Sequence, residues 1–320
     1  MKVHRRSNNI LIVLLFMILV TGISLVVSFF DKGEYIESNI ETTTTTEEVV
    51  EDNICNREVT IEDLPENITS IIDEINEYYK KNNNYFGFKY MDIETGFNIS
   101  VNEHNNVFAA STIKAPAVIY LWEQANEGKI DLDERITYEE RHYDTGAGII
   151  QYKPVGKTYP TRDLLNYSII HSDNIAHNML MKKYGRKNFM EFWKSKGAEV
   201  LFTKEDWGDI NAHDAVIYMN ELYRFYKENN QYSDIVMNDF LNASKKFNIS
   251  PNGKPVANKA GWYHETKHDA SIIFDDKPYI LVTLSTLGSK YNGPYFKDIS
   301  NLVYKLHTEY WNYRNSICKR

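Results

Sequence analysis

The sequence predicts a fold that combines α-helices with one antiparallel β-sheet, whose strands come from the two ends of a domain and whose helices are inserted between them. Apolar runs and alternations typical of strands occupy residues 85–101 and again residues 255–287. Between these two regions, apolar residues recur at spacings of three and four, as in amphipathic helices. This order of elements favours one sheet built from both ends of the domain, with a helical insert.

Composition limits the classes of function that are open. The 320 residues include 44 acidic and 36 basic side chains, which gives a formal net charge of −8. A protein that binds nucleic acid normally carries a basic stripe, so no nucleic-acid partner is expected. Hydrophobic residues make up 42% of the chain, enough for a sizeable core, and 15 Gly with 8 Pro exclude a collagen-like or linker-like chain.

The first 63 residues are expected to form an anchor and a tether. Residues 1–9 are basic and residues 10–30 contain no charged side chain, a length that crosses a bilayer as a helix. This pattern predicts a transmembrane anchor with a cytoplasmic N-terminal tip and everything after it outside the cell. A cleaved signal peptide is the alternative. Residues 31–63 are acidic and rich in Thr and Glu, which predicts an extended tether.

Residues 64–320 are expected to form the folded domain. Cys318 lies near its end, and the only other cysteine, Cys55, lies in the tether; one disulfide and two free thiols both remain open. Periodicity predicts a first helix over residues 68–79, and the segment Asp92 to Gly96 supplies the turn of a hairpin. The later elements are expected to be helices at 112–127, 161–171, 174–184, 187–195, 212–229 and 299–313, and strands at 255–262, 269–274 and 279–287.

A first candidate for chemistry is the pattern Ser111-Thr112-Ile113-Lys114 at the start of an apolar helix. Residues three apart share a helix face, so Lys114 lies within reach of Ser111. A serine becomes a good nucleophile when a base takes its proton, and a lysine does this once burial or nearby positive charge lowers its pKa. Taken alone, the pattern is better explained by a serine that caps the helix.

Two further patterns follow in the chain. Residues 172–174 read Ser-Asp-Asn between two apolar helices, and residues 259–261 read Lys-Ala-Gly in a predicted strand. Each has an ordinary explanation, because Ser, Asp and Asn are common in loops and caps, and a glycine in a strand often marks a bulge. The three patterns in this order, each in its structural context, are much more specific than any one of them.

Together the three motifs resemble S-x-x-K, S-D-N and K-T-G of the class A β-lactamases and penicillin-binding proteins, a family of penicillin-recognising serine hydrolases. The resemblance covers residues 65–315, and the phrases that carry it are FAASTIKAPAV, IIHSDNIAHNML and KAGWYHETKHDASIIF. It implies a two-lobed fold, with an α/β lobe and an all-α lobe, and a site between the lobes. It implies no metal and no cofactor.

The resemblance also implies a role for each motif residue. Ser111 would attack an amide carbonyl and become acylated, with Lys114 as general base, and Ser172 would relay a proton to the leaving nitrogen. The backbone N–H groups of Ser111 and Trp262 would form the oxyanion hole. The residues implied to bind substrate are Asn174, Lys259, Gly261 and Trp262.

The sequence departs from the family pattern at two places. Position 260 is Ala where the family has Thr or Ser, which removes a hydroxyl that contacts the substrate carboxylate. The E-x-x-L-N phrase that supplies the deacylating glutamate of class A β-lactamases is absent, and the position four before Asn211 is Trp207. Glu205 and Asp206 are the substitutes nearby, although solvated acids are the norm in such a loop.

A motif of another class lies next to the third pattern. Residues 264–268 read His-Glu-Thr-Lys-His and match the H-E-x-x-H zinc motif, which requires both histidines on one helical turn. The flanks of His264 and His268 are strand-like, so a hairpin turn that separates the two histidines is expected. A zinc metallopeptidase that uses Glu265 as its base is therefore a remote alternative.

The function predicted from the sequence is that of a membrane-anchored, extracytoplasmic serine hydrolase of the class A β-lactamase type in a Gram-positive-like bacterium, opening β-lactam amides through Ser111. A D,D-peptidase acting on D-Ala-D-Ala-type peptidoglycan stem peptides is the closest alternative, and the missing glutamate favours it. A domain that acylates slowly, or that binds β-lactams or cell wall without turnover, is a third possibility.

Overall fold

The structure is a computed structural model that describes residues 59–80, 86–205, 207–286 and 294–318. All of them belong to a compact unit that spans residues 52–320. Cys318 is disulfide-bonded, and Cys55 lies outside the described residues. The predicted boundaries between tip, anchor, tether and domain also lie outside them or at their edge, and stay predictions.

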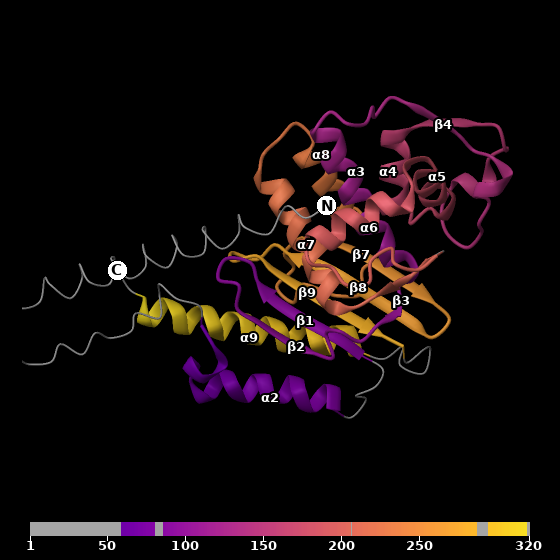
Figure 1. The fold of residues 1–320 in the computed structure, drawn as a ribbon. Helices are drawn as coiled ribbons and strands as arrows, with labels where there is room; N and C mark the ends of the chain where they lie inside the picture. The colour runs from indigo at the N-terminus through magenta and orange to yellow at the C-terminus, as the bar shows by residue number, and fades with distance from the viewer. Residues whose placement is uncertain (1–58, 81–85, 206, 287–293, 319–320) are drawn as a thin grey trace, which may run out of the picture. The chain divides into compact units, whose positions relative to one another are not determined.

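Five antiparallel strands form the main sheet, in the order β2-β1-β9-β8-β7 (Figure 1). All seven residues of β9, YILVTLS, are buried, so this strand needs a partner on both sides and cover on both faces. It pairs with β1 from Phe86 opposite Ser285 to Asp92 opposite Tyr279. The prediction of one antiparallel sheet built from both ends of the domain is confirmed. The strands are β1 (Phe86–Asp92), β2 (Asn98–Val101), β7 (Val256–Tyr263), β8 (Thr266–Ile273) and β9 (Tyr279–Ser285).

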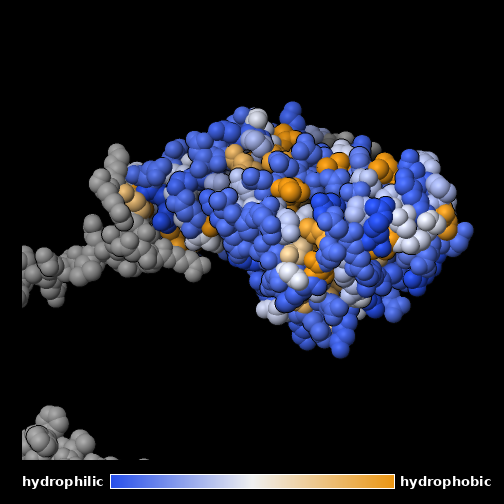
Figure 2. Space-filling model, turned by 90° about the horizontal axis from the view of Figure 1, so that it is seen from above, coloured by the Kyte–Doolittle hydropathy of each residue, from blue (hydrophilic) through white to orange (hydrophobic). Residues whose placement is uncertain are grey.

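Each face of the sheet packs against its own apolar core. Along β9, Tyr279 and Leu281 belong to one core and Ile280 and Val282 to the other, as the alternation of a strand requires. Two helices from the ends of the domain cover the first core, and the second lies under α7 and the helical insert (Figure 1). Because many of the protein's apolar residues lie in these cores, the face drawn in Figure 2 is mostly hydrophilic, with small separate hydrophobic groups. The covering helices are α2 (Glu66–Lys80), α9 (Tyr295–Ile317) and α7 (Ala212–Lys227).

The helical insert forms the second lobe and agrees with the predicted helices. The expected helix at 112–127 begins as a 3₁₀ turn before it becomes α-helical. One nine-residue helix was not predicted, because so short a segment depends on tertiary packing of Val236, Met237 and Phe240. The helices of the insert are η3 (Ala110–Ile113), α3 (Lys114–Asn126), η4 (Glu140–His142), η5 (Ile150–Tyr152), α4 (Thr161–Ile170), α5 (Asn174–Tyr184), α6 (Arg186–Ser195) and α8 (Ser233–Leu241).

Short elements complete the described chain. A 3₁₀ turn precedes α2, and two small ribbons pair β3 with β6 and β4 with β5. The β3–β6 ribbon brings the segment before the first motif beside the segment that follows α6. These elements are η1 (Ile61–Asp63), β3 (Val107–Phe108), β4 (Arg135–Thr137), β5 (Thr158–Pro160) and β6 (Asp209–Ile210).

The predicted localisation, a single-pass membrane protein, is contradicted. Among the residues that the structure describes, no helix combines the length and the apolar character needed to span a bilayer. The 23-residue helix α9 is long enough, but it carries charges such as Lys297, Asp298 and Lys305. The predicted anchor at residues 10–30 lies outside the described residues.

Candidate active site

The first motif lies at the junction of η3 and α3. Lys114 Nζ lies 3.2 Å from Ser111 Oγ, so the two side chains are within hydrogen-bond distance, as the three-residue spacing predicts. Ala110, directly before the serine, has φ +46°, a left-handed conformation that is unfavourable for a residue with a Cβ. Such strain persists only where the surrounding packing fixes the backbone, and functional sites are where it concentrates.

Lys114 is fully buried, and polar atoms of the second motif surround its amine. Lys114 Nζ donates to Asn174 Oδ1 at 2.7 Å, and it also contacts Ser172 Oγ at 3.3 Å and the Ser172 carbonyl oxygen. The ring of Trp207 lies beside it, with the ring centroid 4.9 Å from Nζ. The amine is therefore fixed in position between the first and second motifs.

The surroundings of Lys114 favour the neutral amine. Burial lowers its pKa well below the ordinary value for lysine, and the charge of Lys259 lowers it further. The carboxylates of Asp173 and Asp144 act in the opposite direction. A neutral amine next to a serine hydroxyl can accept its proton, which is the property a general base requires.

Lys259 of the third motif approaches the same serine of the second motif. Its Nζ donates to Ser172 Oγ at 3.0 Å and to the Ala260 carbonyl at 2.8 Å. Burial lowers the pKa of Lys259 to about 7, against the opposing effect of Asp269. The Ser172 hydroxyl consequently lies between two buried amines, and a continuous series of polar contacts runs from Ser111 to Lys259.

Asp173 holds the second motif in place. Fully buried, it caps α5 by accepting from the Ala176 N–H at 2.9 Å. Its other oxygen accepts from the N–H groups of Ile149 at 2.6 Å and Ile150 at 2.8 Å. Gly148 is required beside it, because a Cβ there would lie 2.2 Å from Asp173 Cγ and its φ is +104°. The glycine allows the segment 144–150 to pack directly on the motif.

Asn174 connects this segment to Lys114. Its amide nitrogen donates to the Thr145 carbonyl at 2.7 Å and to Asp144 Oδ1 at 3.3 Å, while its amide oxygen accepts from Lys114. Sequence reasoning missed Asp144. The glycine-rich run Asp-Thr-Gly-Ala-Gly at 144–148 was the available signal, because two closely spaced glycines indicate close backbone approach.

Gly261 places the third motif against the first. A Cβ at this position would lie 2.8 Å from the Thr112 nitrogen and 2.9 Å from the Ser111 nitrogen, so only glycine lets β7 approach this backbone. Trp262, the next residue, is 45% exposed and lines the adjoining cavity. The backbone of Ser111 therefore lies beside the part of β7 that leads to Trp262, whose backbone N–H is the second predicted donor of the oxyanion hole.

A cavity of about 620 Å³ opens above Ser111. Its wall combines the motif residues with an aromatic rim, and such a mixture of apolar surface with a few convergent polar groups is typical of small-molecule sites. Phe108 and Tyr263 of the rim contact each other, with centroids 5.7 Å apart. The lining residues are Phe108, Ala110, Ser111, Asp144, Thr145, Gly146, Ala147, Asn174, Trp207, Trp262, Tyr263 and His264.

The sequence lacks the family's deacylating glutamate, and the structure shows which side chains lie near Lys114 and the cavity in this chain. Trp207 lines the cavity beside Lys114, where its ring also stacks on His177 at 5.2 Å. Glu205 is a solvated acid whose side chain is 88% exposed and pairs with Arg186. Asp206 lies outside the described residues. Among the residues described, Asp144 is the one carboxylate that lines the cavity.

The H-E-x-x-H motif does not form a zinc site. His264 and Glu265 make the tight turn between β7 and β8, with φ +49° at His264, as the hairpin prediction requires. His268 lies in β8, where its Nε2 contacts the Phe108 carbonyl at 2.9 Å and its Nδ1 accepts from the Ser285 N–H at 3.1 Å. Both ring nitrogens are engaged, so the metallopeptidase alternative is wrong.

Comparison with known proteins finds solved structures with a similar fold. A mutant of PBP-A in an acyl-enzyme complex with penicillin G has a TM-score of 0.68 and 20% identity over 75% of this chain and 97% of its own. A β-lactamase from Sphaerobacter thermophilus has a TM-score of 0.62 and 17% identity, covering 73% and 95%. One from Chitinophaga pinensis has a TM-score of 0.65 and 17% identity, covering 74% and 98%. These likenesses show a shared fold.

The family itself is shown by a match over most of the chain. Residues 70–307 match the model of the Beta-lactamase enzyme family. Three motifs that lie far apart in the sequence converge beside one cavity, in the fold that the similar structures share. The chain therefore belongs to the beta-lactamase enzyme family.

Proposed function

We propose that this protein opens β-lactam amides by acylation of Ser111. The observation that carries the proposal is the position of Lys114 Nζ, buried and 3.2 Å from Ser111 Oγ at the cavity. The PBP-A mutant, which has a similar fold, forms an acyl-enzyme with penicillin G. This precedent supports a β-lactam as the first substrate class to test.

Acylation begins with transfer of the Ser111 hydroxyl proton to the neutral Lys114 amine. The serine oxygen attacks the carbonyl carbon of the lactam, and an oxyanion forms that accepts hydrogen bonds from the backbone N–H groups of Ser111 and Trp262. The approach of β7 to the Ser111 backbone at Gly261 supports this placement of the oxyanion hole. Preorganised donors of this kind commonly contribute on the order of 10²–10³ in rate.

Collapse of the oxyanion breaks the carbon–nitrogen bond and requires a proton on the leaving nitrogen. Ser172 supplies it and recovers a proton from Lys114, since its Oγ contacts the amines of both Lys114 and Lys259. The products are a serine ester and a secondary amine, so the protons balance without a co-reactant. Lys259 also provides the positive charge that attracts a substrate carboxylate. Because position 260 is Ala, no hydroxyl at that position adds a hydrogen bond to the carboxylate.

The substrate side chain would lie along the rim of the cavity. Asn174 Nδ2, which already donates to the Thr145 carbonyl, lies where an acylamide of the substrate can bind. The exposed rings of Trp262, Tyr263 and Phe108 provide an apolar surface beside it. Substrates with an aromatic or other apolar acyl group suit this rim.

Deacylation is expected to be slow. Trp207, and not a glutamate, lies beside Lys114, and an indole cannot activate water. The same observation favours a second candidate function, a D,D-peptidase of the penicillin-binding type, in which the same serine forms a peptidyl ester from a stem peptide and the C-terminal amino acid leaves. In both cases Ser111 is the nucleophile, and a stable penicillin adduct is the expected result.

Intact-mass spectrometry after incubation with penicillin G tests the proposal. We expect one covalent adduct per chain, which persists for minutes or longer, and none in Ser111→Ala. Ser195→Ala removes an exposed serine of α6 and serves as the matched control, which should acylate like the unmodified protein. An unchanged adduct in Ser111→Ala would contradict the assignment of the nucleophile. Penicillin loss without any adduct would contradict slow deacylation.

A further inference from the structure

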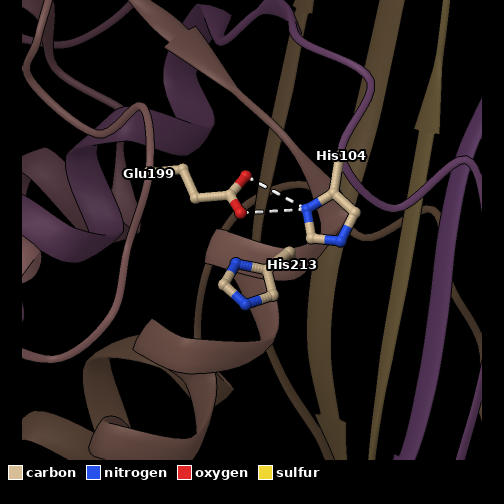
Figure 3. A group of neighbouring side chains, drawn as sticks. All are labelled: His104, Glu199 and His213. Atoms are coloured by element: carbon tan, nitrogen blue, oxygen red, sulfur yellow. Dashed lines mark hydrogen bonds and ion pairs between the residues drawn. The ribbon is translucent and has the colours of Figure 1, made fainter.

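A second cluster of reactive side chains lies outside the lining of the cavity. His104, Glu199 and His213 each offer a nitrogen or oxygen atom, and these atoms lie within 4.8 Å of one another (Figure 3). The three residues come from separate segments: His104 from the connection between β2 and β3, Glu199 from the segment after α6, and His213 from the first turn of α7. The acylation mechanism uses none of them.

A buried carboxylate orients the His213 side chain and holds the backbone at Glu199. Asp214 is fully buried, and its Oδ1 lies 3.1 Å from His213 Nδ1 and accepts from the Glu199 N–H at 2.9 Å. The contact with this carboxylate fixes the orientation of the His213 ring. Histidines that bind metals in proteins almost always have such a partner.

Further hydrogen bonds fix the other parts of the cluster. The buried Asn211 side chain donates to Glu199 Oε2 at 3.0 Å, and Glu199 Oε1 lies 3.0 Å from His104 Nδ1. The His213 backbone N–H donates to the Glu103 carbonyl at 3.0 Å, which ties the start of α7 to the segment that carries His104. Asn211 and Asp214 thus hold Glu199 and His213 from outside the cluster, and His104 is held by Glu199 itself.

We propose that His104, Glu199 and His213 bind one divalent transition-metal ion, of which Zn²⁺ is the representative. Two imidazoles and one carboxylate are a ligand set that zinc uses, whereas Mg²⁺ and Ca²⁺ prefer oxygen ligands throughout. A tetrahedral ion with bonds of about 2.1 Å needs ligand atoms about 3.4 Å apart. The side chains of His104 and Glu199 are 59% and 42% exposed, so they can rotate until their ligand atoms reach this distance from the ligand atom of His213.

A bound ion would add a further link between the three segments that carry its ligands. The segment after α6 that begins near Glu199 continues to Trp207, whose ring lies beside Lys114. Binding to the folded state alone stabilises that state in proportion to the logarithm of metal concentration over the dissociation constant. Metal binding therefore raises the temperature of unfolding, and this effect is independent of any activity toward β-lactams.

Isothermal titration calorimetry of the full chain, free of any polyhistidine tag and treated with chelator, tests the proposal with Zn²⁺. We expect one ion per chain and a rise in the unfolding temperature, with no such response to Mg²⁺. His104→Ala and Glu199→Gln should each weaken binding at least tenfold. Because both side chains are substantially exposed, these variants should keep the unfolding temperature of the metal-free protein. His171→Ala, which removes an exposed histidine elsewhere, is the matched control and should bind zinc normally.

The role of Asp214 has its own readout. Asp214→Asn keeps the shape of the side chain and weakens the orientation of His213, so zinc affinity should fall roughly 10–100-fold. If this variant does not fold, His213→Gln replaces it and should abolish tight binding. No heat of zinc binding in the unmodified chain, or the same affinity and stoichiometry in His104→Ala and Glu199→Gln, would overturn the proposal.

Discussion

Lys114 and Lys259 place two amines in the protein interior on either side of the Ser172 hydroxyl. Burial of a charged amine opposes folding, and burial is the largest cause of the lowered pKa at both lysines. The same cost makes the Lys114 amine useful, because a lysine of ordinary pKa stays protonated at neutral pH and cannot accept a proton. Stability and chemistry are therefore in conflict at these two residues.

Replacing Lys259 by methionine should make the protein more stable at neutral pH and slower to acylate. Between pH 7, the approximate pKa of folded Lys259, and pH 10.5, the unfolded state binds more protons at this lysine than the folded state. The free energy of unfolding therefore rises with pH through this window, and the cost of the charge is fully present below it. At pH 7 the gain of Lys259→Met is expected to be roughly 2–5 kcal/mol.

Urea unfolding of both proteins at pH 7 and pH 9.5 measures this difference. The difference in free energy of unfolding between Lys259→Met and the unmodified protein should be smaller at the higher pH. Lys194→Met, at an exposed position of α6, is the control and should show a small difference at both values. Two outcomes would contradict a buried amine with a lowered pKa. One is a lower free energy of unfolding for Lys259→Met than for the unmodified protein at pH 7. The other is a difference between the two proteins that increases with pH.

Among the elements, close approaches of backbone segments bring the motifs together. Strand β7 reaches η3 only because position 261 has no Cβ, and the segment 144–150 reaches Asp173 only because position 148 has none. Both contacts join pieces of chain that are distant in sequence but adjacent at the cavity. Each glycine therefore determines where a whole element can lie, and the site depends on the spacing between elements as much as on the motif side chains.

The substitution Gly148→Ala should disrupt the second motif. Its Cβ would overlap Asp173, and its φ of +104° is unfavourable for alanine. Gly156→Ala is a matched control, because φ there is +91° and no heavy atom lies within 4 Å of the added Cβ. Both variants should lose about 1–3 kcal/mol for the backbone conformation. Gly148→Ala alone should lose more and should also acylate more slowly with penicillin G. Equal stability and equal acylation rates in the two variants would contradict this role of Gly148.

In the whole molecule, one face of the sheet packs on a core that contributes to stability, and the candidate active site lies away from that core. The core under α2 and α9 lies on one face, and the first two motifs lie with the helical insert, next to strand β7, which carries the third. Strands β1 and β9 come from opposite ends of the domain, so the sheet forms only when both ends have been brought together. The helix α9 then completes the core that holds them.

A cavity in that core should reduce stability and leave acylation unchanged. Leu306 of α9 is fully buried, so Leu306→Ala is expected to lower the free energy of unfolding by about 2–5 kcal/mol. Leu302→Ala, on the same helix at a partly buried position, should lose less. The acylation rate of the folded protein with penicillin G should stay the same in both. A large loss of acylation rate in Leu306→Ala at a temperature where it is folded would show that the two faces are coupled.

The sequence by itself determined the order of the elements, the single sheet from both ends of the domain and the residues of the three motifs. These depend on local periodicity and on short spacings such as that of Ser111 and Lys114, which one helical turn brings together. The family resemblance was also visible in the sequence, and the match over residues 70–307 bears it out. The sequence pattern at residues 10–30 predicted a membrane protein, which the described helices contradict.

Only the tertiary structure decided which distant residues meet. Trp207 lies beside Lys114, Asp144 contacts Asn174, and His104, Glu199 and His213 come together, although no spacing in the sequence relates these residues. It also decided that His268 packs in a strand and does not bind metal with His264. The physical reason is that contacts between distant segments depend on how whole helices and strands pack, and on glycines that allow their approach, whereas periodicity records only the local backbone.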